Sequence, residues 1–170
     1  AVFTLLIITS FHMLTLMLAG VGPLAQPFEM AKIFGYSDVT ALPLLIIAYV
    51  SAIVLRKDRH VHSRLISVTL FAGLLPAAAR MFFGLLVMTG LANVGTREEI
   101  LQGLSLAIHP TYIFVLVVLG VAALVDWRKG SLRWPFPFAF AWLAIVYATF
   151  FPGAHSQWFD YVARTIASLA

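Results

Sequence analysis

The sequence has no cysteine and little charge, and both shortages narrow the class of protein. Without cysteine, disulfides, thiolate metal sites and cysteine nucleophiles are excluded. Only 11% of the 170 residues are charged while 62% are hydrophobic, whereas about a quarter of a typical soluble sequence is charged. The basic residues lie at the ends of apolar runs, so the net charge of +4 does not indicate a nucleic-acid partner. This pattern predicts an integral membrane protein.

Signatures of several enzyme classes are also missing. The chain has no Gly-rich phosphate loop, no G-x-S-x-G elbow and no H-E-x-x-H pair. All seven acidic residues map to loops or to the ends of apolar runs, which argues against a di-iron carboxylate site and an acidic proton relay. The apolar runs show no inverted repeat of the kind that secondary transporters use. The sequence therefore favours a protein that is not an enzyme.

Apolar runs of sufficient length predict an all-α transmembrane bundle in a single domain. About 20 helical residues cross a hydrocarbon core of about 30 Å. Two shorter segments, 27–35 and 156–169, are amphipathic and are expected to lie at the membrane interface. An alternative for the second is the start of a sixth span. The five predicted spans are residues 2–20, 39–55, 65–91, 100–125 and 134–151.

The loops between these spans differ in basic residues, which predicts an orientation. The loops after the second and fourth spans hold seven lysines and arginines, and the other two loops hold only Lys32 and Arg97. By the positive-inside rule the former are cytoplasmic and the C-terminal tail is periplasmic. Their basic side chains are expected to contact anionic lipid headgroups. These residues are Arg56, Lys57, Arg59, Arg64, Arg128, Lys129 and Arg133. His60 and His62, two apart in the same loop, make only a weak metal pair.

Two histidines inside the spans are candidate cofactor ligands. His12 and His109 both fall near the predicted midplane, and bis-histidine ligation of haem b needs imidazoles at equal depth on different helices. A chlorophyll-type pigment would need only one of them. The other interpretation is that both are packing contacts, bonded to a threonine, a tyrosine or a carbonyl freed by a proline.

Arg80 is the third ionisable residue within a span. It could pair with a haem propionate and so belong to a cofactor site. Alternatively, its long side chain extends to the headgroups or pairs with an acid at the outer surface. The acids within the predicted reach are Glu29, Asp38, Glu98 and Glu99.

Three stretches resemble a group of uncharacterised small multi-span bacterial inner-membrane proteins. They are H-S-R-L-I at 62–66, L-L-P-A-A-A-R at 74–80 and D-W-R-K-G-S-L-R-W at 126–134, and the resemblance covers about residues 40–150. It implies a bacterial inner membrane and directs attention to Arg64 and Arg80, without implying an activity.

Together these observations favour an accessory or structural subunit of a larger membrane complex, in contact with lipids or pigments and most simply without a cofactor. Two observations support this prediction: catalytic groups are scarce, and 14 Phe, 4 Trp and 5 Tyr residues are spread over the chain. The alternative is a small haem-b electron carrier that uses His12 and His109, with quinone as a partner.

Overall fold

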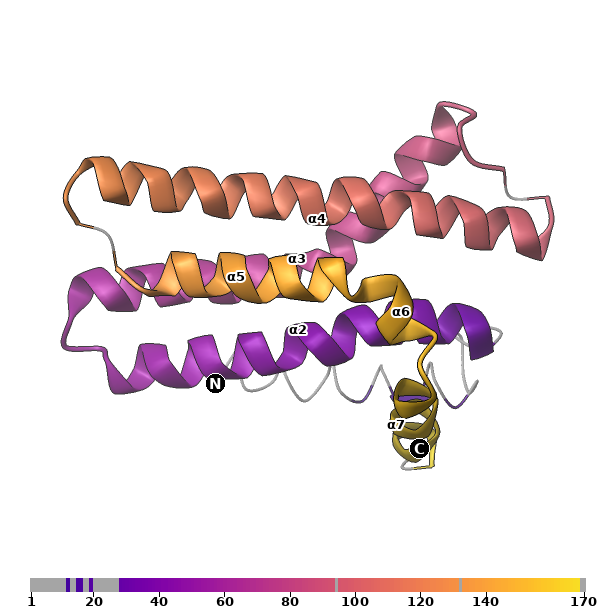
Figure 1. Ribbon diagram of the computed structural model, residues 1–170, viewed down its shortest axis with the longest axis horizontal. Coiled ribbons are helices and arrows are strands. Elements are labelled where there is room, and N and C mark those ends of the chain that lie inside the picture. Colours follow the sequence, from indigo (N-terminus) through magenta and orange to yellow (C-terminus); the bar gives the residue numbers. More distant parts are fainter. Residues whose placement is uncertain are drawn as a thin grey trace.

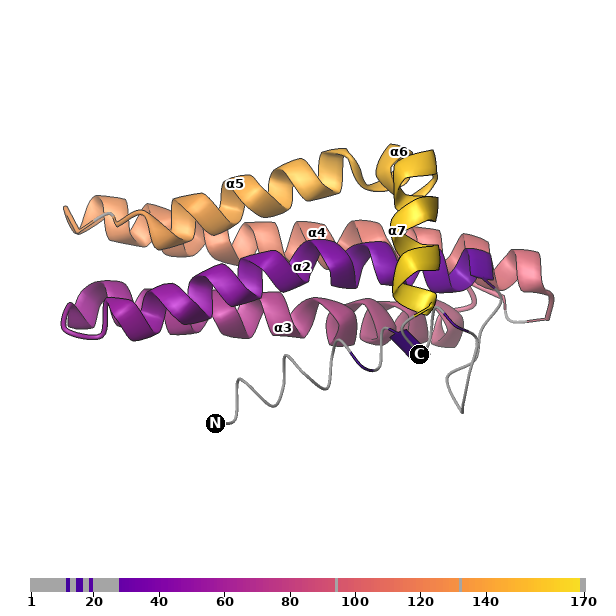
Figure 2. The same cartoon turned by 90° about the horizontal axis from the view of Figure 1, so that it is seen from below.

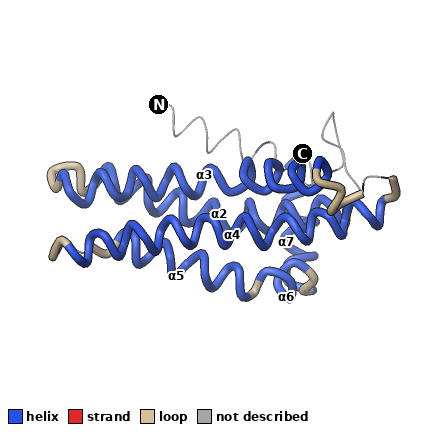
Figure 3. The backbone as a smooth tube through the Cα atoms, turned by 90° about the horizontal axis from the view of Figure 1, so that it is seen from above, coloured by secondary structure: helices blue, strands red, loops and turns tan. Residues whose placement is uncertain are grey.

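The protein is built from helices joined by short loops. The computed structural model describes residues 12, 15, 16, 19, 28–93, 95–131 and 133–168. Within these residues every regular element is a helix, and Figure 3 shows no strand among them. The helices are α2 (Phe28–Val54), α3 (Arg59–Met88), α4 (Arg97–Arg128), α5 (Pro135–Ala148), α6 (Phe150–Ala154) and α7 (Gln157–Ala167).

Three helices are long and apolar enough to cross a membrane. These candidate spans are Gly35–Val54, Arg59–Met88 and Glu98–Arg128. They correspond to the predicted spans 39–55, 65–91 and 100–125 and confirm, for the described residues, an all-helical fold with helices apolar and long enough to cross a membrane. The number of five spans is not confirmed, since the first, 2–20, lies largely outside the described residues.

The fifth predicted span is interrupted. Helix α5 has 14 residues and ends at Ala148, short of the predicted 134–151. Pro152 explains this end, because proline has no N–H to donate to the carbonyl of Ala148 four residues earlier. Thr149 follows α5, and the chain re-forms only the five-residue helix α6.

The segment 27–35 is not a separate helix. Helix α2 begins at Phe28 and continues without a break to Val54, through Gly35 and Asp38. Ile33 and Tyr36 are buried, so the first turns of α2 already pack into the bundle. As a result Asp38 stands inside a long helix rather than in a loop before it.

Helices α2 to α5 form an antiparallel bundle. Figure 1 shows α2 and α4 on opposite sides with α3 and α5 between them, whereas the turned view of Figure 2 shows α5 and α3 on the outer sides with α4 and α2 between them. The loops 55–58 and 129–134 meet at one end, which we call the basic end. The loop 89–96 and helices α6 and α7 lie at the other end, the far end.

The interior of the bundle is closely packed. Each of the helices α2 to α5 contributes fully buried leucine side chains to it: Leu44, Leu65, Leu75, Leu119 and Leu143. Between membrane helices such contacts stabilise through packing, because lipid tails are as apolar as leucine. The core therefore fixes how the helices sit side by side and carries their polar side chains to common positions.

Glycines end the two longest helices. Gly90 after α3 and Gly130 after α4 have φ of 73° and 62°, the left-handed conformation that glycine adopts most readily. The N–H groups of Gly130 and Ser131 donate to the carbonyls of Trp127 (2.9 Å) and Asp126 (2.9 Å). These two bonds are a Schellman motif, so the turn after α4 has a defined direction.

Helix α7 crosses the far end of the bundle, as Figure 2 shows. Phe159 and Ala163 of α7 are fully buried, and the Phe159 ring lies edge-on to Tyr36 at 5.1 Å between centroids. Asp160 accepts a hydrogen bond from Lys32 Nζ at 2.7 Å. The apolar side of α7 thus packs on protein, whereas Trp158 is 65% exposed.

Candidate functional site

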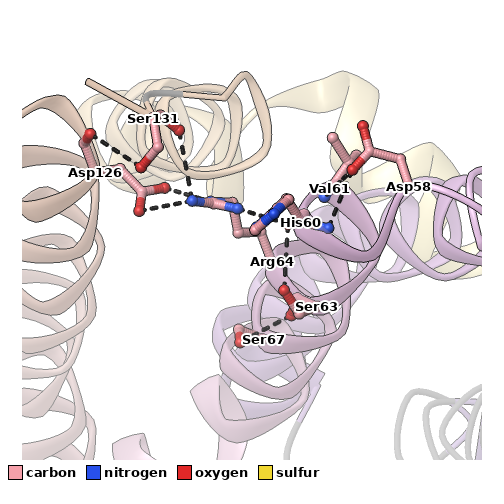
Figure 4. Close-up of polar contacts among 8 residues, drawn as sticks. All are labelled: Asp58, His60, Val61, Ser63, Arg64, Ser67, Asp126 and Ser131. Carbon is pink, nitrogen blue, oxygen red and sulfur yellow. Dashed lines mark hydrogen bonds and ion pairs between the residues drawn. The ribbon is translucent and has the colours of Figure 1, made fainter. Parts of the chain in front are cut away.

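Asp58, the residue before α3, organises the basic end. Its Oδ1 accepts hydrogen bonds from the backbone N–H groups of His60 (3.0 Å) and Val61 (3.2 Å), drawn in Figure 4. These donors, Val61 foremost, hold the pKa of the Asp58 carboxyl below its usual range. This N-cap fixes the first turn of α3 and with it the position from which Arg64 extends.

Arg64 joins α3 to the end of α4 through a forked ion pair. Its Nε donates to Oδ2 of Asp126, and its Nη2 donates to Oδ1 at 2.9 Å. The same guanidinium donates to the carbonyls of His60 (Nη1, 2.7 Å) and Ser131 (Nη2, 3.4 Å), as Figure 4 shows. Both charged side chains are 12% exposed. We call Arg64, Asp126 and the two carbonyls the Arg64 clamp.

The helix ends explain why the clamp forms. Gly130 turns the chain back after α4, and this turn brings the carbonyl of Ser131 beside the side chain of Asp126. Two oxygens of one carboxylate match the planar guanidinium fork. Arg64 is therefore directed into the protein. The other basic residues predicted to contact headgroups are exposed: Arg56, Lys57, Arg59, Arg128, Lys129 and Arg133.

A second polar group lines a cavity towards the far end, between α2, α3 and α4. Its polar lining residues are Ser37, Asp38, Arg80, Thr111 and Tyr112. The cavity measures about 20 Å³, which is room for one molecule of the size of water. Apolar side chains complete its walls, so the polar groups face one another in a largely apolar setting.

Arg80 faces this cavity and also reaches the surface. Its Nη1 donates to the carbonyl of Pro76 at 3.2 Å, one turn earlier on α3. It also attracts Asp38 of α2 electrostatically. Of the four acids within its predicted reach, Asp38 shares the cavity, while Glu99 bonds to the backbone N–H of Thr96 in the capping box of α4.

His109 belongs to an aromatic cluster beside the cavity. Its Nδ1 lies 2.8 Å from the hydroxyl of Tyr147 on α5, and its ring packs on Phe151 at 5.4 Å between centroids. Tyr147 stacks on the buried ring of Tyr112, which lines the cavity, at 5.4 Å. A hydrogen bond to a tyrosine is one of the alternatives that the sequence left open for this histidine. The side chain of His109 is nevertheless exposed.

His12 is also exposed, and its carbonyl accepts a hydrogen bond from Thr15 Oγ1 at 2.7 Å. The aromatic and hydrogen-bonding partners of the His109 ring among the described residues are Tyr147 and Phe151, not His12. At the basic end the Nδ1 of His62 lies 2.8 Å from the carbonyl of Ala52. Over the described ranges, no three His, Asp or Glu side chains gather as a metal site.

The sequence did not single out Asp126, Tyr112 or Tyr147 as site residues. For Asp126 a signal exists, because Arg64 and Asp126 directly adjoin the basic-loop ends of two predicted spans, 65–91 and 100–125. Opposite charges at equal depth on neighbouring helices are expected to pair. The two tyrosines carry no such signal, since tyrosine at a span end also serves as an ordinary interfacial anchor.

In comparisons with known proteins, no family model, no curated protein and no solved structure matches the chain.

Proposed function

We propose that this protein is a non-catalytic accessory subunit, which packs against other subunits of a larger bacterial membrane complex and contacts lipids or pigments. The observation that carries the proposal is an apolar stripe along α3. Leu70, Leu74, Met81, Leu85 and Met88 are each 47–85% exposed. At 100° per residue they fall within about 60° of one another around the helix.

A stripe of this width suits a neighbouring helix. A packing seam is narrow and repeats every three or four residues. The apolar stripe extends along most of α3, from the half nearer the basic end to the last turn. Leucine and methionine are unbranched at Cβ and adapt to an irregular partner surface.

The test separates a packed partner from lipid. We expect the protein, extracted in mild detergent, to co-purify with a defined partner, and Leu74→Trp to abolish this association. Tryptophan is accommodated by fluid lipid but collides within a packed helix interface. Val117→Trp on α4, where the native side chain is 57% exposed, is the matched control. A monodisperse monomer, or a partner retained equally by both variants, contradicts the proposal.

The proposed location is the bacterial inner membrane, with the basic end in the cytoplasm. The six exposed lysines and arginines at that end support this orientation. Because the chain has no cysteine, single cysteines report sidedness without background. A membrane-impermeant maleimide should label Glu98→Cys in intact cells and Lys57→Cys only after lysis. The opposite labelling pattern would overturn the orientation.

A second candidate function, binding of haem b or a pigment, is favoured by the surroundings of His109. Histidine ligands are commonly oriented by a hydrogen bond to the ring nitrogen that does not bind the metal. The Tyr147 hydroxyl occupies that role at Nδ1, which leaves Nε2 for an axial position. Haem would supply one-electron transfer, with a quinone as partner and His12 as the second ligand.

An absorption spectrum of the purified protein decides this second candidate. Haem ligation predicts a Soret band that disappears in both His12→Ala and His109→Ala. Tyr147→Phe should shift the reduction potential while keeping the band, because it removes only the orienting hydrogen bond. A preparation that stays colourless after incubation with haem contradicts this candidate.

A further inference from the structure

The polar cavity towards the far end holds both an acid and a base. Asp38 enters it from α2 and Arg80 from α3, while the hydroxyl groups of Ser37, Thr111 and Tyr112 share its lining. Opposite charges close together in a span are costly to maintain and indicate a functional contact.

The position of the cavity along the helices places it near a headgroup region. Asp38 lies 16 residues before Val54, and Tyr112 lies 16 residues before Arg128, the basic-end limits of α2 and α4. Both are thus about 24 Å from the basic end. On this count the cavity lies in the far half of a hydrocarbon core about 30 Å thick, and His109, one turn farther from the basic end than Tyr112, lies beyond the midplane expected for it.

The side chain of Arg80 spans the distance that remains. It is exposed at one edge of the cavity, on a part of α3 that continues for eight more residues to Met88. A guanidinium on such a stem reaches from hydrocarbon to the phosphate level of the bilayer. Asp38 sits deeper and less exposed, flanked by the hydroxyl groups.

We propose that Arg80 and Asp38 form a binding site for a phosphoethanolamine group, carried by a zwitterionic phospholipid of the far leaflet. Arg80 binds the phosphate, which matches the guanidinium fork. Asp38 accepts hydrogen bonds from the ammonium, with Ser37 and Thr111 as neighbouring oxygens. The acyl chains extend from this headgroup into the surrounding bilayer.

This arrangement predicts an order of binding affinity among phospholipids. Phosphatidylethanolamine satisfies both charges. Only the ammonium of phosphatidylethanolamine is small enough to enter a cavity with room for one water-sized group, whereas the trimethylammonium of phosphatidylcholine is larger and has no N–H donor. Phosphatidylglycerol lacks the positive charge and leaves Asp38 unsatisfied. Loss of one hydrogen bond to a charged group corresponds to about tenfold in affinity.

The experiment is a titration of the delipidated protein with these three lipids, matched in acyl chains, followed by native mass spectrometry. We expect phosphatidylethanolamine to bind about tenfold more tightly than either competitor. Arg80→Gln should weaken all three lipids, whereas Asp38→Asn should remove only the preference for ethanolamine. Arg133→Gln, an exposed residue at the basic end, is the matched control and should keep the wild-type order.

Equal affinities of the wild-type protein for the three lipids overturn the proposal, and so does an unchanged order in both cavity variants. If a variant fails to fold, the order of lipid affinities of the wild-type protein decides the test by itself. Soluble phosphoethanolamine distinguishes the source of the group: we expect no displacement of the lipid at equal concentration. Complete displacement would assign the cavity to a soluble ligand and refute the lipid.

Discussion

Replacement of Asp126 by asparagine tests whether the Arg64 clamp holds α3 against α4. The change keeps the shape of the side chain but removes its charge and turns one acceptor oxygen into a donor. Arg64 then loses its bidentate partner while both side-chain positions stay 12% exposed. Breaking a buried ion pair by removing one partner costs about 3–5 kcal/mol.

The structure places the expected loss at the lower end of that range. The carbonyls of His60 and Ser131 still accept hydrogen bonds from the guanidinium after the substitution. We therefore expect Asp126→Asn to lower the free energy of unfolding by about 3 kcal/mol. The double variant Arg64→Met/Asp126→Leu should recover most of this loss, because it leaves no buried charge.

The measurement is unfolding in mixed detergent micelles, with helix content followed by circular dichroism. Arg59→Gln, at an exposed position in the first turn of α3, is the control and should change stability by less than about 0.5 kcal/mol. A loss below about 1 kcal/mol in Asp126→Asn, typical of an exposed pair, refutes the reasoning. Additive effects of Arg64→Met and Asp126→Leu would do the same.

Four further substitutions probe other parts of the fold. Gly130→Ala should lower the free energy of unfolding by about 1 kcal/mol, because φ at this position is 62°. Gly84→Ala within α3 should raise it slightly, because an added Cβ there meets nothing within 4 Å. Thermal melting compares the two variants. Thr96→Ala should cost about 1 kcal/mol in the same assay, because it removes the hydroxyl of the capping box. Lys32 lowers the pKa of Asp160, so α7 should be fully docked at a pH above the ordinary pKa of aspartate and should detach as the pH falls through the lowered pKa. Tryptophan fluorescence should report this transition. Asp160→Asn should abolish the pH dependence. A transition of equal midpoint in Asp160→Asn would contradict the assignment.

The helical, membrane-spanning character was predictable because it depends on composition and run length alone. The limits of the helices were less so. The sequence predicted an interfacial segment ending at residue 35 and a separate span starting at residue 39, but α2 continues through both, and Ile33 and Tyr36 are buried in the bundle. Tertiary packing outweighed local preference there, and this placed Asp38 within a span.

The candidate site was predicted only in part for the same reason. Arg80 and His109 were identified because ionisable residues within apolar runs are conspicuous. The shared cavity of Arg80 and Asp38 and the hydrogen bond between His109 and Tyr147 depend on how the helices rotate against one another, which a single sequence does not specify. Arg64 was expected to meet lipid, yet its depth equals that of Asp126, and the two charges meet inside the protein.

The short helix α5 has a consequence for the surrounding bilayer. Its 14 residues span about 21 Å, whereas the 32 residues of α4 beside it span about 48 Å. The molecule thus presents two unequal hydrophobic heights to lipid on adjoining sides. A membrane of uniform thickness meets such a wedge by thinning locally or by letting the protein lean. We therefore expect the bundle to sit at an angle in the membrane and to favour regions where lipid thickness already varies.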